Sequence, residues 1–392
     1  MVVHLVKEEK ARVGNDTSGG LSNIKCFTVQ FDKESGVDES DVASRTSTWL
    51  GVDLHPVALD EVAMASRFED VVWFSETPLP DVNGMGRLAM AEQAHAHGLK
   101  VILTGEGSDE HFAGYADFGP DALLELDLSW VPSLVPEAER FRAWRTETSN
   151  KGAVSNLFGD SNAQVPESTF RMLNHTSLPS RLAKFFYLPF ASWTDSYGSS
   201  APETTLAESL DGRIRDAMMN KWHPLHTSEY IWTKTILQNY LLRYLGDHVD
   251  MAHHIETRPP FLDHHLTEYV NGIPPSLKMK YNSTSQTLRE KHILREAVKP
   301  FITEEVYHRT KQSYLGPSRY GENGPLHHLM KRILTRENVE RLGFLDWDAV
   351  RAQMEKAFQL KDPIAFRRTL SVAQFAVLGQ RFGVKTATEP QT

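Results

Sequence analysis

The sequence has a single cysteine, Cys26, among its 392 residues, no excess of positive charge and no long apolar run. One cysteine excludes an internal disulfide and a zinc site built from several cysteines. A net charge of −9 provides no broad basic surface for nucleic acid or for an anionic membrane. No apolar run is long enough to cross a bilayer, and charged residues follow Met1 too closely for a secretory signal. These absences predict a cytoplasmic protein with no nucleic-acid partner and no membrane partner.

What is present is the balance of a globular protein, with 40% hydrophobic and 24% charged residues. The first part of the chain alternates between helical and strand-like patterns, which predicts a parallel sheet with flanking helices. The run Leu99–Gly105 is continuously apolar, as in a strand buried on both faces. The expected elements are a helix over 1–12, a strand over Ile24–Phe31, a helix from about Asp38, a strand over Leu54–Leu59, helices over Glu61–Phe74 and Met85–His97, and the strand Leu99–Gly105.

Strand signals fade after residue 121, and helical patterns follow. Helices are expected near Thr204–Asn220, Ser228–His248, Gln286–Lys299, Leu326–Arg336 and Asp362–Phe382. In the last of these, Asp362 and Pro363 have the residue types of a helix cap and a first helical position. We therefore predict an α/β part over 1–120, a mainly helical part over 121–380 and a frayed tail over 381–392.

The segment VILTGEGSDEHFAGY, Val101–Tyr115, has the strongest chemical signal. It runs from the end of a strand into a glycine-containing turn, the position at which parallel sheets bind ligands. Three acidic residues, Glu106, Asp109 and Glu110, are close together there, and bound Mg²⁺ would relieve their repulsion. A glycine-rich turn with a capping aspartate and solvated acids is the alternative, since short motifs also match by chance.

Three blocks in order then establish a resemblance. They are GEGSDE with Gly114–Tyr115, MAHHIETRPPFLDHHL, and EKHILREAV followed by HRTKQSYLGP. They are similar to SGEGSDExFGGY, MAxxxExRxPFLD, and EKxxLRE with RxKxxF, the signatures of the asparagine synthetase family. The similarity extends from residue 1 to about 320 and covers the C-terminal synthetase domain of that family. It implies an ATP-pyrophosphatase-type fold, related to the adenine nucleotide alpha-hydrolases.

The resemblance also implies a reaction and a set of residues. In the family, ATP and Mg²⁺ convert aspartate to β-aspartyl-AMP, and ammonia then gives asparagine. The matching catalytic positions are Glu106, tied to the adenylate intermediate, and Lys311, near the α-phosphate. The matching nucleotide-binding positions are Val29 for adenine, Thr104 and Gly105 for ATP, and Asp109 for Mg²⁺ and pyrophosphate. Glu256, Arg258 and Asp263 lie in the second block, where we expect a buried ion-pair network.

The family grips pyrophosphate with SGGLDSS, between a first strand and a first helix. Ser18–Leu21 reads SGGL, but it lacks Asp-Ser-Ser and leads into a strand, so no helix N-terminus is there to hold phosphate. MVVHLVKEEKAR instead resembles the helix that follows this loop, so we expect the loop to lie before Met1. The glutaminase domain, with its N-terminal cysteine, is expected to be absent as well. The nitrogen would then come from free ammonia or from a separate glutaminase partner.

Three functions remain open at this point. In the first, the chain is an asparagine synthetase-like ligase that has only part of its phosphate-binding site. Alternatively it is a pseudoenzyme or binding module of the same fold, or a fragment of a longer reading frame. A third reading is a relative that acts on another carboxylate, as in closure of a β-lactam ring. In-frame codons for SGGLDSS upstream of Met1 would identify a truncated reading frame, and their absence would favour a pseudoenzyme.

Overall fold

A computed structural model describes most of the chain. The SGGL segment at 18–21 and the last three residues of the predicted tail lie outside the described residues. The described residues are 1–13, 24–130, 135–149, 165–182, 188–196, 201–312 and 314–389.

The N-terminal part begins with helix α1 (Val2–Arg12) and then forms a parallel strand pair, as predicted. Strands β1 (Lys25–Gln30) and β2 (Asp53–Ala58) align with Val29 opposite Val57, and helix α2 (Ser40–Leu50) connects them. Their β-branched and aromatic residues suit a pleated, half-buried surface. Helices α3 (Glu61–Ser75) and α4 (Asn83–Ala96) follow close to their predicted positions, so the alternation of strands and helices is confirmed.

A second parallel pair, β3 (Val101–Leu103) with β4 (Glu256–Arg258), corrects two expectations. The strand at Leu99–Gly105 is not buried on both faces, since Val101 is 39% and Leu103 48% exposed. Within the described residues β3 pairs with β4 and no other strand, so part of its surface stays uncovered. Strand β4 itself was not predicted, because a three-residue strand of Glu, Thr and Arg has no apolar signal.

The expected ion-pair network in the MAHHIETRPPFLDHHL block is also wrong. Glu256 and Arg258 alternate along β4 and so share one face, where they pair with each other while remaining exposed. Asp263 lies after the strand and caps helix α14 (His264–Asn271) by accepting hydrogen bonds from the backbone of His265 and Leu266. These residues therefore terminate and cap local elements.

The rest of the chain is mainly helical, with three departures from prediction. The helix expected over Thr204–Asn220 is two helices, α11 (Pro202–Ser209) and α12 (Gly212–Asn220), because the backbone is extended at Leu210 and Asp211 then caps the second helix. The first half of Gln286–Lys299 is not helical: an antiparallel hairpin, β5 (Lys280–Asn282) and β6 (Thr287–Arg289), precedes α16 (His292–Val298). The helix near Ser228–His248 starts as α13 (Pro224–Trp232) and continues as η7 (Thr233–Val249), a π-helix.

The predicted cap of the last long helix is confirmed: Asp362 accepts a hydrogen bond from the backbone of Ala365, and α21 (Pro363–Arg381) follows. No helix in the described ranges combines the length and apolar character needed to cross a membrane. The remaining helices are α5 (Ser108–His111), α6 (Gly119–Ala122), α7 (Glu137–Ser149), α9 (Glu167–Met172), α10 (Leu178–Leu182), α15 (Pro275–Lys278), α17 (Glu304–His308), α18 (Pro325–Ile333), α19 (Arg336–Leu342) and α20 (Trp347–Gln359).

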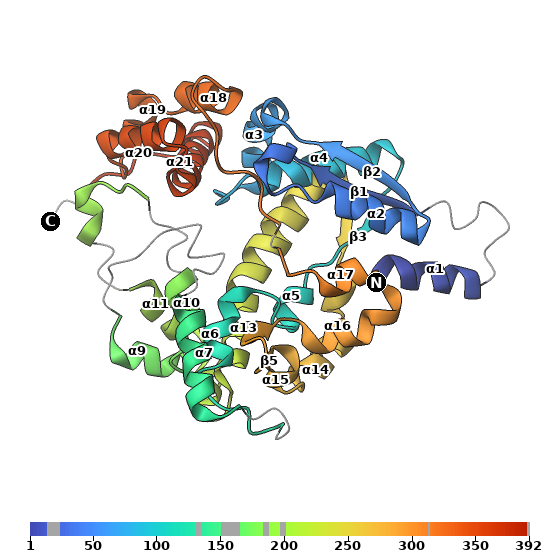
Figure 1. Ribbon diagram of the computed structural model, residues 1–392. Coiled ribbons are helices and arrows are strands. Elements are labelled where there is room, and N and C mark those ends of the chain that lie inside the picture. Colours follow the sequence, from blue (N-terminus) through green and yellow to red (C-terminus); the bar gives the residue numbers. More distant parts are fainter. Residues whose placement is uncertain are drawn as a thin grey trace.

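Two large and two smaller apolar clusters hold the described elements together. The larger one joins Val29 and Phe68 from the N-terminal part to Leu326 and Phe366 near the C-terminus, and helices α18 and α21 pack on α3 (Figure 1). The second gathers around α13 and the start of η7. Leu241 of η7 packs against both clusters. Helix η7 therefore lies between the two packed regions, next to the turn that follows β3.

Candidate functional site

The turn after β3 is shaped by two glycines that a larger residue could not replace. Gly107 has φ 95°, and a Cβ there would collide with the side chain of Leu262. A Cβ on Gly114 would overlap Asp109 and Lys291. The side chain of Glu110 accepts a hydrogen bond from the Gly107 backbone nitrogen at 2.9 Å. The turn thus uses Glu110 for its own structure and leaves the other two acids for a ligand.

A cavity of about 390 Å³ opens beside this turn. Of the predicted site residues, Gly105, Glu106, Asp109 and Lys311 line it, although they come from segments far apart in the sequence. The structure therefore brings these four residues to one cavity, while the roles that the resemblance implies for them remain predictions. The volume lies within the range of roughly 300–1,000 Å³ common for small-molecule sites.

Thr104 and Val29 are not part of the cavity lining. Thr104 is next to it in sequence, and its hydroxyl is buried without a hydrogen-bond partner among the described residues. The side chain of Val29 is buried in the larger core, close to Gly86 and therefore near Tyr314, which does line the cavity. The predicted roles of these two residues in binding ATP remain predictions.

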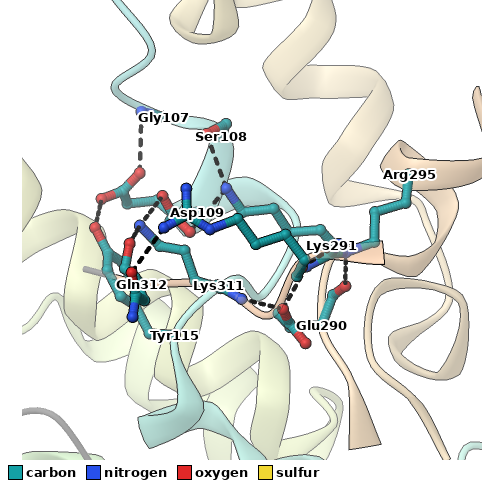
Figure 2. A network of polar contacts seen from close by, with 11 residues as sticks. Gly107, Ser108, Asp109, Tyr115, Glu290, Lys291, Arg295, Lys311 and Gln312 are labelled. Carbon is teal, nitrogen blue, oxygen red and sulfur yellow. Dashed lines mark hydrogen bonds and ion pairs between the residues drawn. The ribbon is translucent and has the colours of Figure 1, made fainter. Parts of the chain in front are cut away.

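Asp109 lies between two lysines, and we call these three residues the carboxylate–lysine cluster (Figure 2). The Nζ atom of Lys291 is 2.8 Å from Asp109 Oδ1, and Nζ of Lys311 is 3.4 Å from Oδ2. Lys291 also donates to the Ser108 hydroxyl at 3.1 Å. Burial lowers the pKa of Lys291, while the charge of Asp109 opposes that shift. The cluster concentrates positive charge at the end of the cavity where the turn lies.

Glu290 fixes the position of Lys311. Its carboxylate accepts a hydrogen bond from the Lys311 backbone nitrogen at 3.0 Å and a second from the Arg295 guanidinium (Figure 2). The segment EKHILREAV therefore supplies one residue that touches Asp109 and two that anchor the segment bearing Lys311. Because its backbone is anchored, Lys311 is held in position at the cavity before a ligand binds.

Glu106 is held by Arg87 of helix α4. Arg87 Nη1 donates to Glu106 Oε1 at 2.7 Å, and the same guanidinium pairs with Asp250, which also accepts from the Thr257 hydroxyl at 2.6 Å. Burial lowers the pKa of Arg87, but the carboxylates of Asp250 and Glu106 outweigh it and the pKa is raised. The second oxygen of Glu106, Oε2, is buried without a hydrogen-bond partner within the described part of the chain. That oxygen is free to accept from a ligand or to bind a cation.

These donors fit a nucleotide with Mg²⁺ better than a metal held by protein alone. Among the described residues, no three His, Cys, Asp or Glu side chains gather as in an all-protein metal site. Mg²⁺ commonly takes only one or two carboxylates and completes its shell with phosphate and water. Asp109 and the unpartnered oxygen of Glu106 supply carboxylates of that kind, and the lysines supply cations for phosphate.

Opposite character is found on the helical side of the cavity. Trp232, Ile236, Leu241 and Leu245 line it, and we call them the apolar wall. All but Trp232 belong to η7, whose i→i+5 hydrogen bonds widen the helical turn so that residues four or five positions apart share a face. Trp232 stacks on Tyr115, with ring centroids 4.3 Å apart.

Sequence reasoning missed Lys291, Arg87 and the apolar wall. Lys291 stands in the block EKHILREAV that carries the resemblance, so a basic residue there was a usable signal. Arg87 lies in an ordinary amphipathic helix without a motif. The apolar wall depends on π-helical spacing, and an expected α-helical period places its residues on different faces.

Known proteins share this sequence pattern along nearly the whole chain. A family model described as asparagine synthase matches residues 1–379. The chain is similar to amidase chyE of Penicillium rubens, at 54% identity over 99% of this chain and 57% of that protein. It is similar to amidase chry2 of Gibberella zeae, at 53% identity over 99% of this chain and 57% of that protein. Asparagine synthetase [glutamine-hydrolyzing] 1 of Bacillus subtilis is 24% identical over 84% of this chain and 50% of its own length. The chain thus spans about half the length of these curated relatives.

Proposed function

Because this chain belongs to the asparagine synthase family, we propose that it activates a carboxylate with ATP and converts it to an amide. The observation that carries the proposal is Asp109 between Lys291 and Lys311, at the turn after β3 and at the edge of a cavity. Both halves of such a reaction build negative charge on oxygen atoms, and fixed cations in a buried site stabilise that charge.

The reaction has two steps. A carboxylate oxygen of the substrate attacks the α-phosphorus of ATP, and pyrophosphate leaves with the electron pair of the broken phosphorus–oxygen bond. Ammonia then attacks the acyl carbon of the adenylate, AMP leaves, and a proton is released to solvent. Lys311, which lines the cavity, stabilises the developing charge on phosphate and carbonyl oxygens. The free oxygen of Glu106 is placed to accept a hydrogen bond from the attacking nitrogen.

Mg²⁺ would be held by Asp109 together with phosphate oxygens and water, and would neutralise charge on the phosphates. Lys311, which now pairs with Asp109, would turn to the phosphate oxygens, since a polyphosphate offers it more negative charge than one carboxylate, while Lys291 would keep its contact with Asp109. Thr104 and Gly105 would contact the nucleotide, and Val29 would present its backbone to adenine. The nitrogen is free ammonia or ammonia from a glutaminase that lies on the same or a separate chain.

The test is exchange of labelled pyrophosphate into ATP. The protein is expressed from its gene with any in-frame sequence that precedes Met1, and is assayed with Mg²⁺ and a panel of carboxylic acids. Exchange that depends on one class of acid supports carboxylate activation. A protein that binds acid and nucleotide but catalyses no exchange, and forms no amide from any acid with ATP and ammonia, would contradict it.

A second candidate function is amide hydrolysis, the activity in the names of two relatives. One contact favours it: the Ser108 hydroxyl lies 3.1 Å from Lys291 Nζ, and a serine with a neutral lysine can act as a nucleophile and its base. The ion pair between Lys291 and Asp109 stabilises the charged lysine, so we favour the ligase. Hydrolysis of an amide without ATP, abolished by Ser108→Ala, would reverse that choice.

A further inference from the structure

The cavity beside the turn is lined by charged residues and by the apolar wall, and the wall bears on the substrate. Asp109, Glu106 and Lys311 are among the charged residues, and a hydrogen-bonded group of Asp81, Asn83 and Tyr240 lines the cavity as well. Two residues of the wall are buried, Trp232 at 5% and Leu245 at 4% exposed, and Ile236 and Leu241 are half-buried. A ligand whose carboxylate reaches Lys311 therefore places the rest of its body near hydrocarbon and aromatic surface.

Aspartate is a poor match for that surface. Besides the carboxylate that reacts, it carries an ammonium group and a second carboxylate, and each needs an oppositely charged partner when buried. The carboxylate that reacts uses Lys311 in either acid, whereas Arg87 is already paired with Asp250 and Glu106, so the second carboxylate of aspartate has no unpaired cation among the described residues that line the cavity. The apolar wall offers no charge to either group. Charged groups against this wall would lose hydration without compensation.

A flat apolar acid matches the cavity in three respects. Its single carboxylate binds near Lys311, and its apolar body covers the apolar wall. Its ring adds to the stack of Trp232 on Tyr115. Lys311 is close to that stack, with its Nζ atom 5.8 Å from the centroid of the Tyr115 ring. Aromatic rings gain from such stacking beyond the area they bury. The cavity volume of about 390 Å³ admits an aromatic acid of modest size.

The wall also holds one unused polar atom. The indole nitrogen of Trp232 is buried and has no hydrogen-bond partner among the described residues. Buried indole N–H groups are usually paired, because an unpaired donor costs free energy. A substrate that carries a carbonyl or ether oxygen on its apolar body would supply the missing acceptor.

From these contacts we infer that the substrate is a carboxylic acid borne on an aromatic or similarly flat apolar body, seated against Trp232, Ile236, Leu241 and Leu245, and that it is not aspartate. The inference rests on the proposed function, since it names the substrate class of the same site. The charged residues and the wall then have different roles, because the charged residues handle ATP and the carboxylate while the wall selects the acid.

The experiment measures binding and catalysis separately. Benzoate, cinnamate, 2-naphthoate and aspartate are titrated into the 392-residue chain by calorimetry without nucleotide, and the same acids are used in pyrophosphate exchange. We expect at least one aromatic acid to bind and aspartate to bind at least roughly tenfold more weakly, since each tenfold step needs only about 1.4 kcal/mol. Tighter binding of aspartate, or no binding by any aromatic acid, would overturn the inference.

A matched pair of variants locates the bound acid. Leu241→Asn places an amide in the apolar wall, and Leu242→Asn makes the same change at the next residue, which packs in the second core cluster and does not line the cavity. Leu241→Asn should weaken aromatic-acid binding by roughly tenfold, and Leu242→Asn by less than about twofold, with equal melting temperatures confirming folding. Equal effects on binding would place the acid elsewhere.

The two proposals fail in different ways. If aromatic acids bind at the apolar wall but support no pyrophosphate exchange, the binding site for an apolar acid stands and the proposed ligase reaction is wrong. If aspartate alone supports pyrophosphate exchange, the proposed ligase reaction stands and the inference of an apolar substrate is wrong.

Discussion

The carboxylate–lysine cluster and the apolar wall line or adjoin the same cavity, yet the chain builds them differently. The cluster assembles from a turn after β3, the start of α16 and the segment around Lys311, which are distant in sequence and are joined by ion pairs. The wall comes almost entirely from one π-helix. The cluster uses charged residues in short motifs, whereas the wall uses common apolar residues in an unusual helical register. The proposed function and the inferred substrate therefore assign chemistry and substrate choice to separate parts of the site, which can be tested by changing each part alone.

The largest expected effect on this division comes from Asp109→Asn. The change keeps the shape of the side chain but removes the negative charge that pairs with both lysines, and replaces one carboxylate oxygen with an NH₂ group that cannot bind Mg²⁺. We expect pyrophosphate exchange to fall by about 10²–10³-fold, as when a single transition-state contact is lost. Binding of an apolar acid should persist or strengthen, because the released lysines attract its carboxylate.

Asp247→Asn is the control, since Asp247 is exposed on η7. If Asp109→Asn abolished acid binding as completely as exchange, the separation between cluster and wall would be wrong. Calorimetry and exchange on one preparation decide the point.

The next largest effects should come from the two lysines, whose substitutions are expected to change different properties. Lys311 lines the cavity, whereas Lys291 lies behind Asp109 and also binds Ser108. We expect Lys311→Ala to lower kcat by about a hundredfold and leave the fold intact. Lys291→Ala should cost about 1–3 kcal/mol of stability, because it removes the closer partner of a largely buried carboxylate.

The measurements are kcat in amide formation and the midpoint of urea unfolding for each variant. The reverse pattern, with Lys311→Ala unfolding the protein and Lys291→Ala slowing only catalysis, would exchange the roles assigned to the two lysines.

The smallest effect on catalysis is expected behind the turn, at the buried pair of Glu229 and Lys278, 2.7 Å apart. Burial raises the pKa of Glu229 to about 7, despite the opposing charge of Lys278. A carboxyl with a raised pKa binds a proton more tightly in the folded state, so its contribution to stability is lost as pH rises from about 4.5 to about 7. Burial lowers the pKa values of His111, which is buried, and His226, which is half-buried, to about 4, so both histidines oppose this trend as pH falls.

Glu229→Gln should remove the loss of unfolding free energy that this carboxyl causes as pH rises. Between pH 5 and pH 7 the stability of the variant should therefore increase relative to that of the parent protein, by up to about 3 kcal/mol. Urea unfolding of both proteins at several pH values checks this. Because the pair lies outside the cavity lining, acid binding at pH 7 should be unchanged; a large change would extend the substrate site to this region.

Much of the fold could be predicted from the sequence where local patterns are long. The alternation of β1, α2, β2, α3 and α4 was predicted because β-branched runs and amphipathic periods are local signals. β4, β5 and β6 were missed, since strands of three residues depend on their partners and not on their own composition.

The same distinction holds in the site. Glu106, Asp109 and Lys311 could be predicted because they belong to motifs, and the structure brings them to one cavity. The exposure of Val101 and Leu103 could not, because it depends on which strands pair with β3. The apolar wall could not be predicted from the sequence either, since the periodicity analysis assumes an α-helix where the chain forms a π-helix.

Transfer of an oxygen isotope tests carboxylate activation most directly. An apolar acid that binds the cavity is labelled with ¹⁸O in its carboxylate and incubated with the protein, ATP, Mg²⁺ and ammonia, and the AMP is analysed by mass spectrometry. The account predicts that AMP carries one labelled oxygen from the acid, because that oxygen attacks phosphorus and leaves with the nucleotide. Amide formed together with unlabelled AMP, or label found only in pyrophosphate or phosphate, would contradict it.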